Sequence, residues 1–259
     1  MHEASLHDAN SFLTLTYSDE FLPEGGSLVH AHCQSFFKRL RESGPFRYFM
    51  AGEYGDKRMR PHYHVLVFGR DFERDRYEWR RRRGVMYYRS ETVEKAWTHR
   101  GEAEAIGNCE FSIDVNFKNA AYVARYVTKK LTGELADERY RRKVGDRWFE
   151  LKPEYCAMSR RPGIGKEWFR RYHPDVFPDD FVVVGGRKIA TPRYYYKLLE
   201  EQNEGLAVQI KEDRYARARE RERESLGKGL VEKYRPLDAR EKICEARLGM
   251  LRRPLEAEE

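Results

Sequence analysis

The stretch Pro61-His62-Tyr63-His64-Val65-Leu66-Val67-Phe68 is rich in β-branched and aromatic residues, and it predicts a strand over residues 62–68. Successive side chains of a strand point to opposite faces, so His62 and His64 project together while Tyr63 points away. Two imidazoles on one face can chelate one divalent ion. A histidine pair that stands alone at this spacing is more often structural, so its meaning depends on the residues around it.

A second pair, His30-Ala31-His32, has the same spacing but lies at the start of a predicted helix over residues 28–41. Residues two apart on a helix do not face each other, so this pair cannot chelate as a unit. The spacing therefore indicates a metal site only at His62 and His64.

A third ligand is expected from the neighbouring strand. Residues 46–52 predict a strand that pairs with residues 62–68 through a basic turn, and Glu53 at its end is placed to supply an oxygen across the hairpin. Two nitrogens and one carboxylate leave room for waters and a phosphate oxygen, which suits Mg²⁺ or Mn²⁺ better than a structural zinc ion. The alternative interpretation of Glu53 is a surface ion pair with Lys57 or Arg58.

The other segments complete an α+β fold, in which helices cover one face of a mostly antiparallel sheet. Their patterns predict strands over residues 11–17 and 109–115 and helices over 28–41, 91–98 and 116–131. Residues 70–89, with the run Arg80 to Arg83, are predicted as a mobile loop or an insertion. We expect one domain over residues 1–200, with its motifs within 10–170, and a charged helical extension over 201–259.

The composition narrows the class of protein. The 259 residues include 50 Lys and Arg against 43 Asp and Glu, and the net charge of +7 modestly favours a polyanionic partner. The four cysteines form no C-x-x-C pair, which argues against a zinc ribbon and a disulfide scaffold. No stretch is long and apolar enough to span a membrane, so we expect a soluble, intracellular protein without a membrane partner. Gly163-Ile164-Gly165-Lys166 is followed by Glu167 and is no Walker motif, so an ATP-driven helicase is excluded.

Residues 119–130 contain the second informative pattern. Tyr122 and Tyr126 are four apart, so on a helix their hydroxyls share one face, and Lys129 lies one turn further along. A tyrosine can attack phosphorus directly, but its phenol, with a pKa of about 10, needs a cation on the phosphate and a nearby lysine to lower the barrier. Aromatic packing is the better interpretation of an isolated tyrosine pair. The combination with an upstream histidine pair in a basic α+β protein favours catalysis.

Three motifs, in this order, resemble those of the replication initiators of microviruses, especially the gokushovirus branch, within the HUH endonuclease superfamily. They are Phe12-Leu13-Thr14-Leu15-Thr16-Tyr17, Pro61-His62-Tyr63-His64, and Tyr122 to Lys130. The phrase Met158-Ser159-Arg160-Arg161-Pro162-Gly163-Ile164-Gly165 is also similar to this branch. One departure is Tyr63, since the superfamily has a bulky hydrophobic residue between the histidines.

The resemblance implies a ferredoxin-like or RNA-recognition-like sheet that carries the metal site, with the tyrosine helix alongside. It implies an enzyme that nicks the viral strand at the replication origin, keeps a 5′-phosphotyrosine bond and leaves a 3′-hydroxyl for a host polymerase. Tyr122 and Tyr126 would alternate as nucleophiles, so that religation releases a circle. A host replication helicase and the host bacterial cytoplasm follow from the same resemblance. Relatives often carry a cysteine-containing segment before the first motif, which leaves an earlier start of this protein open.

Several basic residues are candidates for binding DNA phosphates. They are Lys57, Arg58 and Arg60 beside the expected metal site, Lys130 after the tyrosines, and Arg160 and Arg161 next to a glycine-rich turn. The turn is equally well interpreted as ordinary and solvated. Two rival functions stay open, namely a single-tyrosine HUH transposase or plasmid mobilisation nickase, and a non-catalytic nucleic-acid-binding module.

Overall fold

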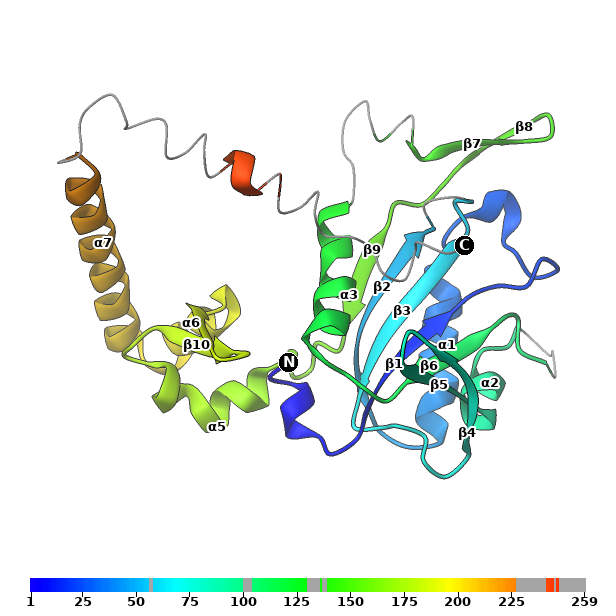
Figure 1. Ribbon diagram of the computed structural model, residues 1–259, viewed down its shortest axis with the longest axis horizontal. Coiled ribbons are helices and arrows are strands. Elements are labelled where there is room, and N and C mark those ends of the chain that lie inside the picture. The colour runs from blue at the N-terminus through cyan, green and yellow to red at the C-terminus, as the bar shows by residue number, and fades with distance from the viewer. Residues whose placement is uncertain are drawn as a thin grey trace. The chain divides into compact units, whose positions relative to one another are not determined.

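The computed structural model describes residues 1–55, 58–99, 104–129, 136, 139–226, 241–244 and 246, without the side chains of 125–129, 225 and 226 (Figure 1). The chain divides into two compact units, Met1–Glu167 and Trp168–Glu259. The first unit contains the predicted strands and both motifs of the expected active site.

A seven-stranded sheet forms the centre of the first unit, and all of its pairings are antiparallel. In spatial order the strands are β4 (Arg76–Arg82), β5 (Val85–Ser90), β6 (Cys109–Ser112), β1 (Asn10–Leu15), β3 (Pro61–Phe68), β2 (Arg47–Tyr54) and β9 (Tyr155–Met158). The expected α+β class with a mostly antiparallel sheet is confirmed. Strand β3 lies between β1 and β2 and is buried along its whole length, which accounts for its apolar run from Val65 to Phe68.

One face of the sheet carries the main apolar core. Strand β3 contributes Tyr63, Val65 and Val67, which alternate with its two histidines. Two helices cover this face, α1 (His30–Glu42) with Cys33, Phe36, Phe37 and Leu40, and α2 (Glu91–Ala96) with Val93 and Ala96. The three- and four-residue spacing on α1 puts its apolar side chains on a single stripe toward the strands.

The Tyr63 hydroxyl ties the start of α1 to the central strand. It accepts a hydrogen bond from the Val29 backbone N–H at 2.8 Å and lies 3.0 Å from the Tyr17 hydroxyl, which in turn lies 2.8 Å from His32 Nδ1. Burial raises the pKa of both phenols above the usual range, so they stay neutral. His32 therefore has a structural role as the hydrogen-bond partner of Tyr17. The segment His30-Ala31-His32 lies at the helix start, as the sequence predicts.

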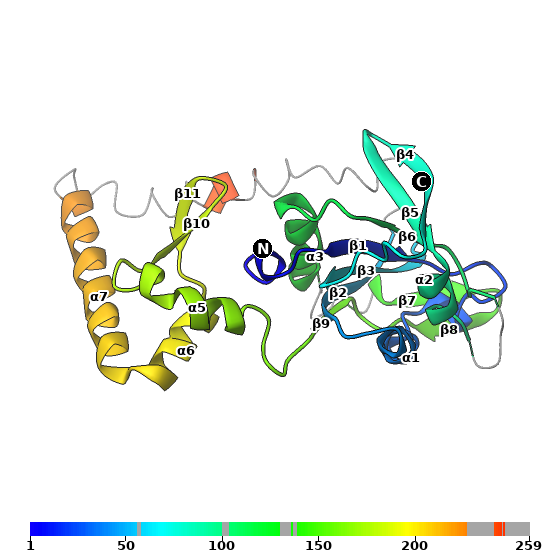
Figure 2. The ribbon, with the colours of Figure 1, turned by 90° about the horizontal axis from the view of Figure 1, so that it is seen from below.

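The opposite face is covered by α3 (Phe117–Lys129), which packs on β2, β3 and β9. In Figure 2 α1 and α3 lie on different sides of the strands. The expectation that helices cover a single face is therefore wrong. The physical reason is that α3 has its own apolar positions, Tyr122 and Val123, both buried, so it needs a second surface to pack against.

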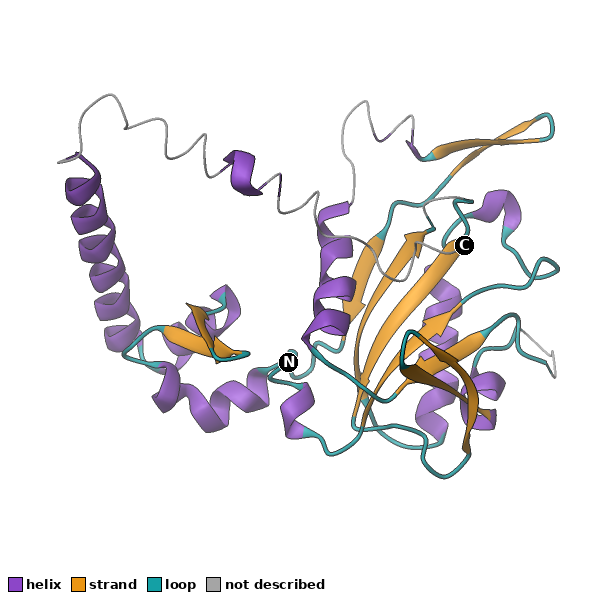
Figure 3. Ribbon diagram, in the orientation of Figure 1, coloured by secondary structure: helices purple, strands orange, loops and turns teal. Residues whose placement is uncertain are grey.

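Residues 76–90 form a hairpin, β4–β5, within the segment predicted as a mobile loop or an insertion (Figure 3). Tyr88 pairs with Phe111 of β6, and the two rings stack at 6.1 Å, which joins the hairpin to the sheet. The residues of β4 are nearly all exposed and charged, so the apolar alternation that identifies a strand is missing. Pairing with β5 supplies the backbone hydrogen bonds that hold this edge strand.

A second hairpin, β7 (Arg141–Val144) and β8 (Arg147–Glu150), packs on the short helical turn η2 (Glu24–Gly26). Gly25 and Gly26 have positive φ angles of 69° and 72°, which glycine adopts at no steric cost. A Cβ at Gly25 would lie 2.6 Å from the ring of Phe149. The glycine pair thus allows Phe149 to pack directly on the turn.

The second unit has its own apolar core. Its elements are the end of α5 (Lys166–Val176), the hairpin β10 (Phe181–Val184) and β11 (Arg187–Ala190), α6 (Arg193–Gln202) and α7 (Glu204–Leu226). Asp180 accepts two hydrogen bonds of 2.6 Å from Arg214 of α7, which fixes the long helix to this core. The charged helix beyond residue 200 is thus present, and none of the described helices is long and apolar enough to cross a membrane.

The structural division between Glu167 and Trp168 differs from the predicted domain boundary near residue 200. Residues Phe169, Tyr195 and Leu199 pack together with Ile210 of α7. The composition of the segment that contains these residues resembles that of the first unit, so it gives no sign of a domain boundary. Only the charge density of α7 differs clearly in the sequence.

The close approach at Gly107 yields a stability prediction. A Cβ at this position would lie 2.1 Å from the Thr16 carbonyl oxygen and 2.5 Å from the Tyr17 Cα, both backbone atoms. Gly107→Ala should therefore lower the free energy of unfolding by about 3 kcal/mol or more, because the segment after β1 must move. Gly84→Ala is the matched control, since nothing lies within 4 Å of its added Cβ and only its φ of +82° is unfavourable, at about 1 kcal/mol. Equal losses in urea denaturation of the two variants would contradict the packing described here.

Candidate active site

The register of β2 and β3 brings the three predicted metal ligands together. Glu53 pairs directly with His62, and Ala51 pairs with His64. Glu53 lies within β2 instead of beyond its end, so backbone pairing with β3 fixes its position. Its side chain is only 2% exposed. The alternative of a surface ion pair with Lys57 or Arg58 does not fit this burial. The two imidazole rings are parallel within 2°, with centroids 6.5 Å apart, and they share one face as strand geometry requires.

Tyr122 of α3 completes a buried cluster with two of these residues. Its hydroxyl donates a hydrogen bond to Glu53 Oε1 at 3.2 Å and lies 3.5 Å from His64 Nε2. His64 Nε2 is itself 2.7 Å from the same Glu53 oxygen. The four side chains, His62 included, are each at most 7% exposed. One predicted nucleophile and the predicted ligand set thus lie at the same place between α3 and the sheet.

Two residues of β1 orient His64, and neither is a site residue predicted from the sequence. Thr14 pairs with His64 across the strands, and its Oγ1 lies 3.2 Å from His64 Nδ1. Phe12 stacks on the His64 ring at 5.7 Å and meets the edge of Tyr122. Alternation in the first motif puts Phe12 and Thr14 on one face, so the signal was present, but the pairing partner of β1 was unknown.

A second buried carboxylate lies further along the same face. Glu110 of β6 pairs with Thr14, is 6% exposed and forms an ion pair of 2.6 Å with Arg80 of β4. Burial and the nearby Glu110 raise the pKa of Tyr87, which lies opposite Arg80 in the hairpin. On the other side Cys156 faces α3, and burial raises the pKa of its thiol to about 11, so the thiol stays protonated.

The donor set suits a hard divalent cation in kind, with two imidazole nitrogens and one carboxylate on neighbouring strands. Within the described part of the chain, however, no three His, Cys, Asp or Glu side chains are arranged as a group that could hold a metal ion. Glu53 and His64 instead hydrogen-bond to each other. The chemistry of the residues therefore fits Mg²⁺ or Mn²⁺, and their geometry is that of a closed hydrogen-bonded cluster.

The remaining predicted site residues fall into four groups. The side chains of Tyr126 and Lys129 lie outside the described residues, although their backbone belongs to α3. Lys57 and Lys130 lie outside the described residues altogether. Arg58 and Arg60 occupy the turn before β3, where Arg60 pairs with Asp19 at 2.7 Å.

Arg160 and Arg161 are not brought to the cluster. Arg47, at the start of β2, donates a hydrogen bond to the carbonyl of Pro162, whereas Glu53 lies six residues further along that strand, about 20 Å away at 3.3 Å per residue. The glycine-rich turn beside them is not an empty phosphate cradle, because the Gly165 N–H donates to Glu3 Oε2 at 2.6 Å. A sequence motif next to β9 thus lies at the opposite end of the sheet from the histidines.

The segment that carries the cluster matches a known protein family. The family model for the replication-associated protein ORF2 matches residues 10–131, which run from β1 to the end of α3 and include the whole cluster. The chain is 36% identical over 206 residues to replication-associated protein VP4 of Bdellovibrio phage phiMH2K, covering 75% of this chain and 59% of the relative. It is 31% identical over 222 residues to replication-associated protein ORF2 of Spiroplasma virus 4, covering 79% of this chain and 63% of that one.

A more distant relative is replication-associated protein ORF4 of Chlamydia phage 1, which is 27% identical over 215 residues, or 77% of this chain and 48% of the relative. The chain thus spans about half to three-fifths of the length of these curated relatives. No solved structure matches the chain.

The hydrogen-bonded cluster predicts different costs for two substitutions in the metal-free protein. Glu53→Ala removes the shared acceptor of His64 and Tyr122 in a buried site and should lower the free energy of unfolding by about 2 kcal/mol. Tyr122→Phe removes only one neutral donor and should cost about 1 kcal/mol or less. Urea denaturation in EDTA measures both values. Full wild-type stability of Glu53→Ala would show that the cluster does not form without metal.

Proposed function

The chain belongs to the replication-associated proteins of microviruses, and from that premise we propose that it is a metal-dependent endonuclease and strand transferase that nicks single-stranded viral DNA through a tyrosine. The observation that carries the proposal is the position of the Tyr122 hydroxyl, 3.2 Å from Glu53 and 3.5 Å from His64. A phenol adjoining a potential metal-binding set has the two components needed for transfer to phosphorus.

In this proposal His62, His64 and Glu53 hold Mg²⁺ or Mn²⁺. When bound, the cation would act as a Lewis acid that polarises the scissile phosphate. Thr14 keeps the His64 ring in place through Nδ1, so that Nε2 faces the site. Phe12 and α3 close the site on its apolar side and limit the access of water.

Tyr122 is the proposed nucleophile. Its oxygen forms a bond to phosphorus, the bond from phosphorus to the 3′ oxygen breaks, and the 5′ phosphate stays on the tyrosine. The hydrogen bond from the Tyr122 hydroxyl points to Glu53, which makes this carboxylate the first acceptor of the phenolic proton. Lys129, one turn beyond Tyr126, would stabilise the departing oxygen. Tyr126 would serve as the second nucleophile. It would cleave the regenerated origin, and the released 3′-hydroxyl would be joined to the 5′ phosphate held on Tyr122.

The partners of this reaction follow from its products. The free 3′-hydroxyl would prime a host polymerase, and a host helicase would separate the strands. The site of action would be the cytoplasm of a host bacterium.

The first test mixes the protein with Mn²⁺ and end-labelled single-stranded DNA that contains viral origin sequences. We expect a labelled band that remains attached to protein under denaturing electrophoresis, and EDTA should remove it. His64→Ala should lower the yield by about 10³-fold or more, because it removes a ligand and the partner of Glu53. Thr98→Ala, far from the cluster at an isolated β-bridge, is the matched control and should keep wild-type yield. Absence of the adduct with every origin sequence tried would contradict the proposal.

Separate tyrosine variants distinguish two nucleophiles from one. If the two alternate, Tyr122→Phe and Tyr126→Phe should each leave a single round of cleavage but block the release of circular product. If one acts alone, its substitution should abolish adduct formation, on the order of 10⁴-fold, while the other retains full activity. Mass spectrometry of the tryptic DNA–peptide adduct identifies the attached residue. Activity that survives the double substitution would exclude a tyrosine mechanism on α3.

A further inference from the structure

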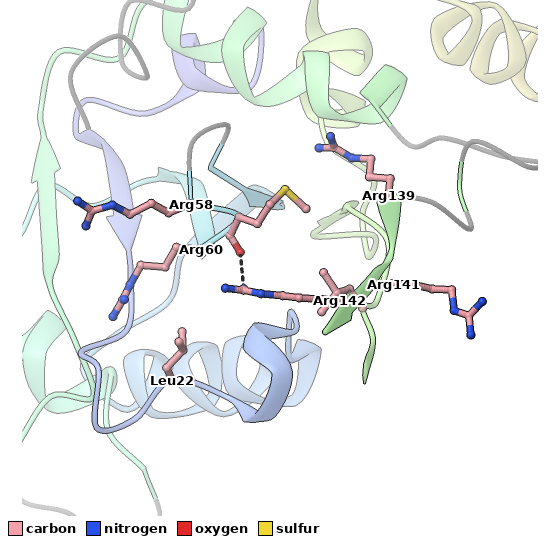
Figure 4. A pocket seen from close by; sticks show the side chains of 8 residues that line it. Leu22, Arg58, Arg60, Arg139, Arg141 and Arg142 are labelled. Carbon is pink, nitrogen blue, oxygen red and sulfur yellow. Dashed lines mark hydrogen bonds between the residues drawn. The ribbon is translucent and has the colours of Figure 1, made fainter. Parts of the chain in front are cut away.

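A pocket of about 540 Å³ opens at the end of the sheet, between the β2–β3 turn and the β7–β8 hairpin. Five arginines line it: Arg58 and Arg60 from the turn, and Arg139, Arg141 and Arg142 from the hairpin and the residues before it (Figure 4). We propose that this pocket and the exposed face of the β7–β8 hairpin bind the sugar-phosphate backbone and a base of single-stranded DNA. The choice of DNA as the occupant rests on the proposed function.

The charge of the pocket is only partly neutralised within the protein. Arg139 pairs with Glu154, a buried carboxylate, at 2.6 Å, and Arg60 pairs with Asp19 at 2.7 Å. Among the described residues no carboxylate forms an ion pair with Arg58 or Arg142, nor with Arg141, whose guanidinium lies by Trp148 on the outer face of the hairpin. Because uncompensated guanidinium groups favour phosphate oxygens and release counterions on binding, the pocket has the chemistry of a polyanion site.

Of the five arginines, Arg142 is the best placed to bind a phosphate in the pocket. In Figure 4 its side chain crosses the pocket toward the carbonyl of Met59, with an N–O distance of 3.5 Å. A Cβ on Gly26 would lie 2.7 Å from its Nη1, so the glycine leaves the space that the guanidinium fills. One weak backbone contact leaves most of the five N–H donors of Arg142 for a ligand.

The outer face of the hairpin supplies a surface for a base. Trp148 is 64% exposed, and it pairs with Lys143 across the hairpin. The Arg141 guanidinium lies 5.8 Å from the Trp148 ring centroid and points away from the pocket in Figure 4. An exposed indole flanked by two cations is a stacking platform for an unpaired base, and bases in a duplex do not present such a free face. The hairpin therefore favours a single strand over a duplex.

The position of the pocket connects it to the candidate active site. Arg60 directly precedes β3, and His62 is the second residue of that strand. Glu53 lies opposite His62, one residue before the end of β2. A strand bound by Arg58 and Arg142 would thus lie at the end of the hairpin that carries the proposed ligands.

The test measures binding without cleavage. The full chain, carrying Tyr122→Phe and kept in EDTA, is titrated into a fluorescein-labelled dT oligomer at several salt concentrations, and anisotropy is recorded. Arg58→Ala with Arg142→Ala should weaken binding at least tenfold and lower the slope of log affinity against log salt by about 1.4, the value for two lost contacts to a single strand. Lys38→Ala with Lys95→Ala, on α1 and α2, removes the same charge elsewhere and should leave the affinity within about twofold.

Three further variants separate stacking and folding from charge. Trp148→Ala should weaken binding of the dT oligomer at least fivefold but leave binding of an abasic oligomer of equal length unchanged, while Trp148→Phe should restore it. Arg58→Lys with Arg142→Lys should recover most of the salt slope, which excludes loss through misfolding.

Equal effects of the pocket and control substitutions would overturn the inference, as would equal weakening of single-stranded and duplex DNA. These outcomes are independent of the nicking reaction. A protein that binds through the pocket but forms no adduct leaves the inference standing and contradicts the proposed function. A protein that forms the adduct while the pocket variants bind DNA normally supports the proposed function and contradicts the inference.

Discussion

The antiparallel register of β2 and β3 is the constraint on which the candidate site depends. It sets Glu53 opposite His62 and puts both imidazoles on the face that α3 covers. A slip by one residue would turn Tyr63, Val65 and Val67 toward α3 and the histidines into the apolar core. The core thus enforces the register, since burying three apolar side chains and keeping the imidazoles out of that core both favour the same alignment.

The two faces of the sheet differ in chemistry: one carries the apolar core, and the other carries the candidate site. The face under α1 and α2 is apolar apart from tyrosine phenols, among them those of Tyr17, Tyr54 and Tyr63, whose hydroxyls are hydrogen-bonded. The face under α3 holds a row of polar groups from four strands, among them Thr14, Glu53 and Glu110. Burial of such groups is costly unless they are hydrogen-bonded or ion-paired. Both ring nitrogens of His64 have a partner, Thr14 Oγ1 at 3.2 Å and Glu53 Oε1 at 2.7 Å. A helix that presents a tyrosine to this row supplies both a packing surface and a reactive hydroxyl.

Two polar hairpins at the rim of the sheet add arginine side chains around its polar face. The β4–β5 hairpin brings Arg80 to Glu110, and the β7–β8 hairpin brings Arg142 toward the turn before β3. Both are polar, exposed ribbons fixed to the fold at a few points, Tyr88 on Phe111 in one and Phe149 on Gly25 in the other. Such ribbons add charge around a rigid centre at little cost to the core, because their side chains remain in solvent. In the function proposed above, these positive rims would contact the nucleic-acid strand.

The sequence alone determined what depends on local periodicity. The alternation from His62 to Val67 predicted the strand and the shared face of its histidines, and the pattern of residues 116–131 predicted the tyrosine helix. The charge beyond residue 200 predicted a helical extension, in which the structure has α7. The tertiary structure decided what depends on pairing between distant segments. It placed Thr14 beside His64 and Glu110 beside Thr14, α3 on the face opposite α1, residues 76–90 in the sheet, and Arg160 far from Glu53. A strand pattern states which residues share a face but not which strand lies next to it, because the choice of neighbour is made by the core as a whole.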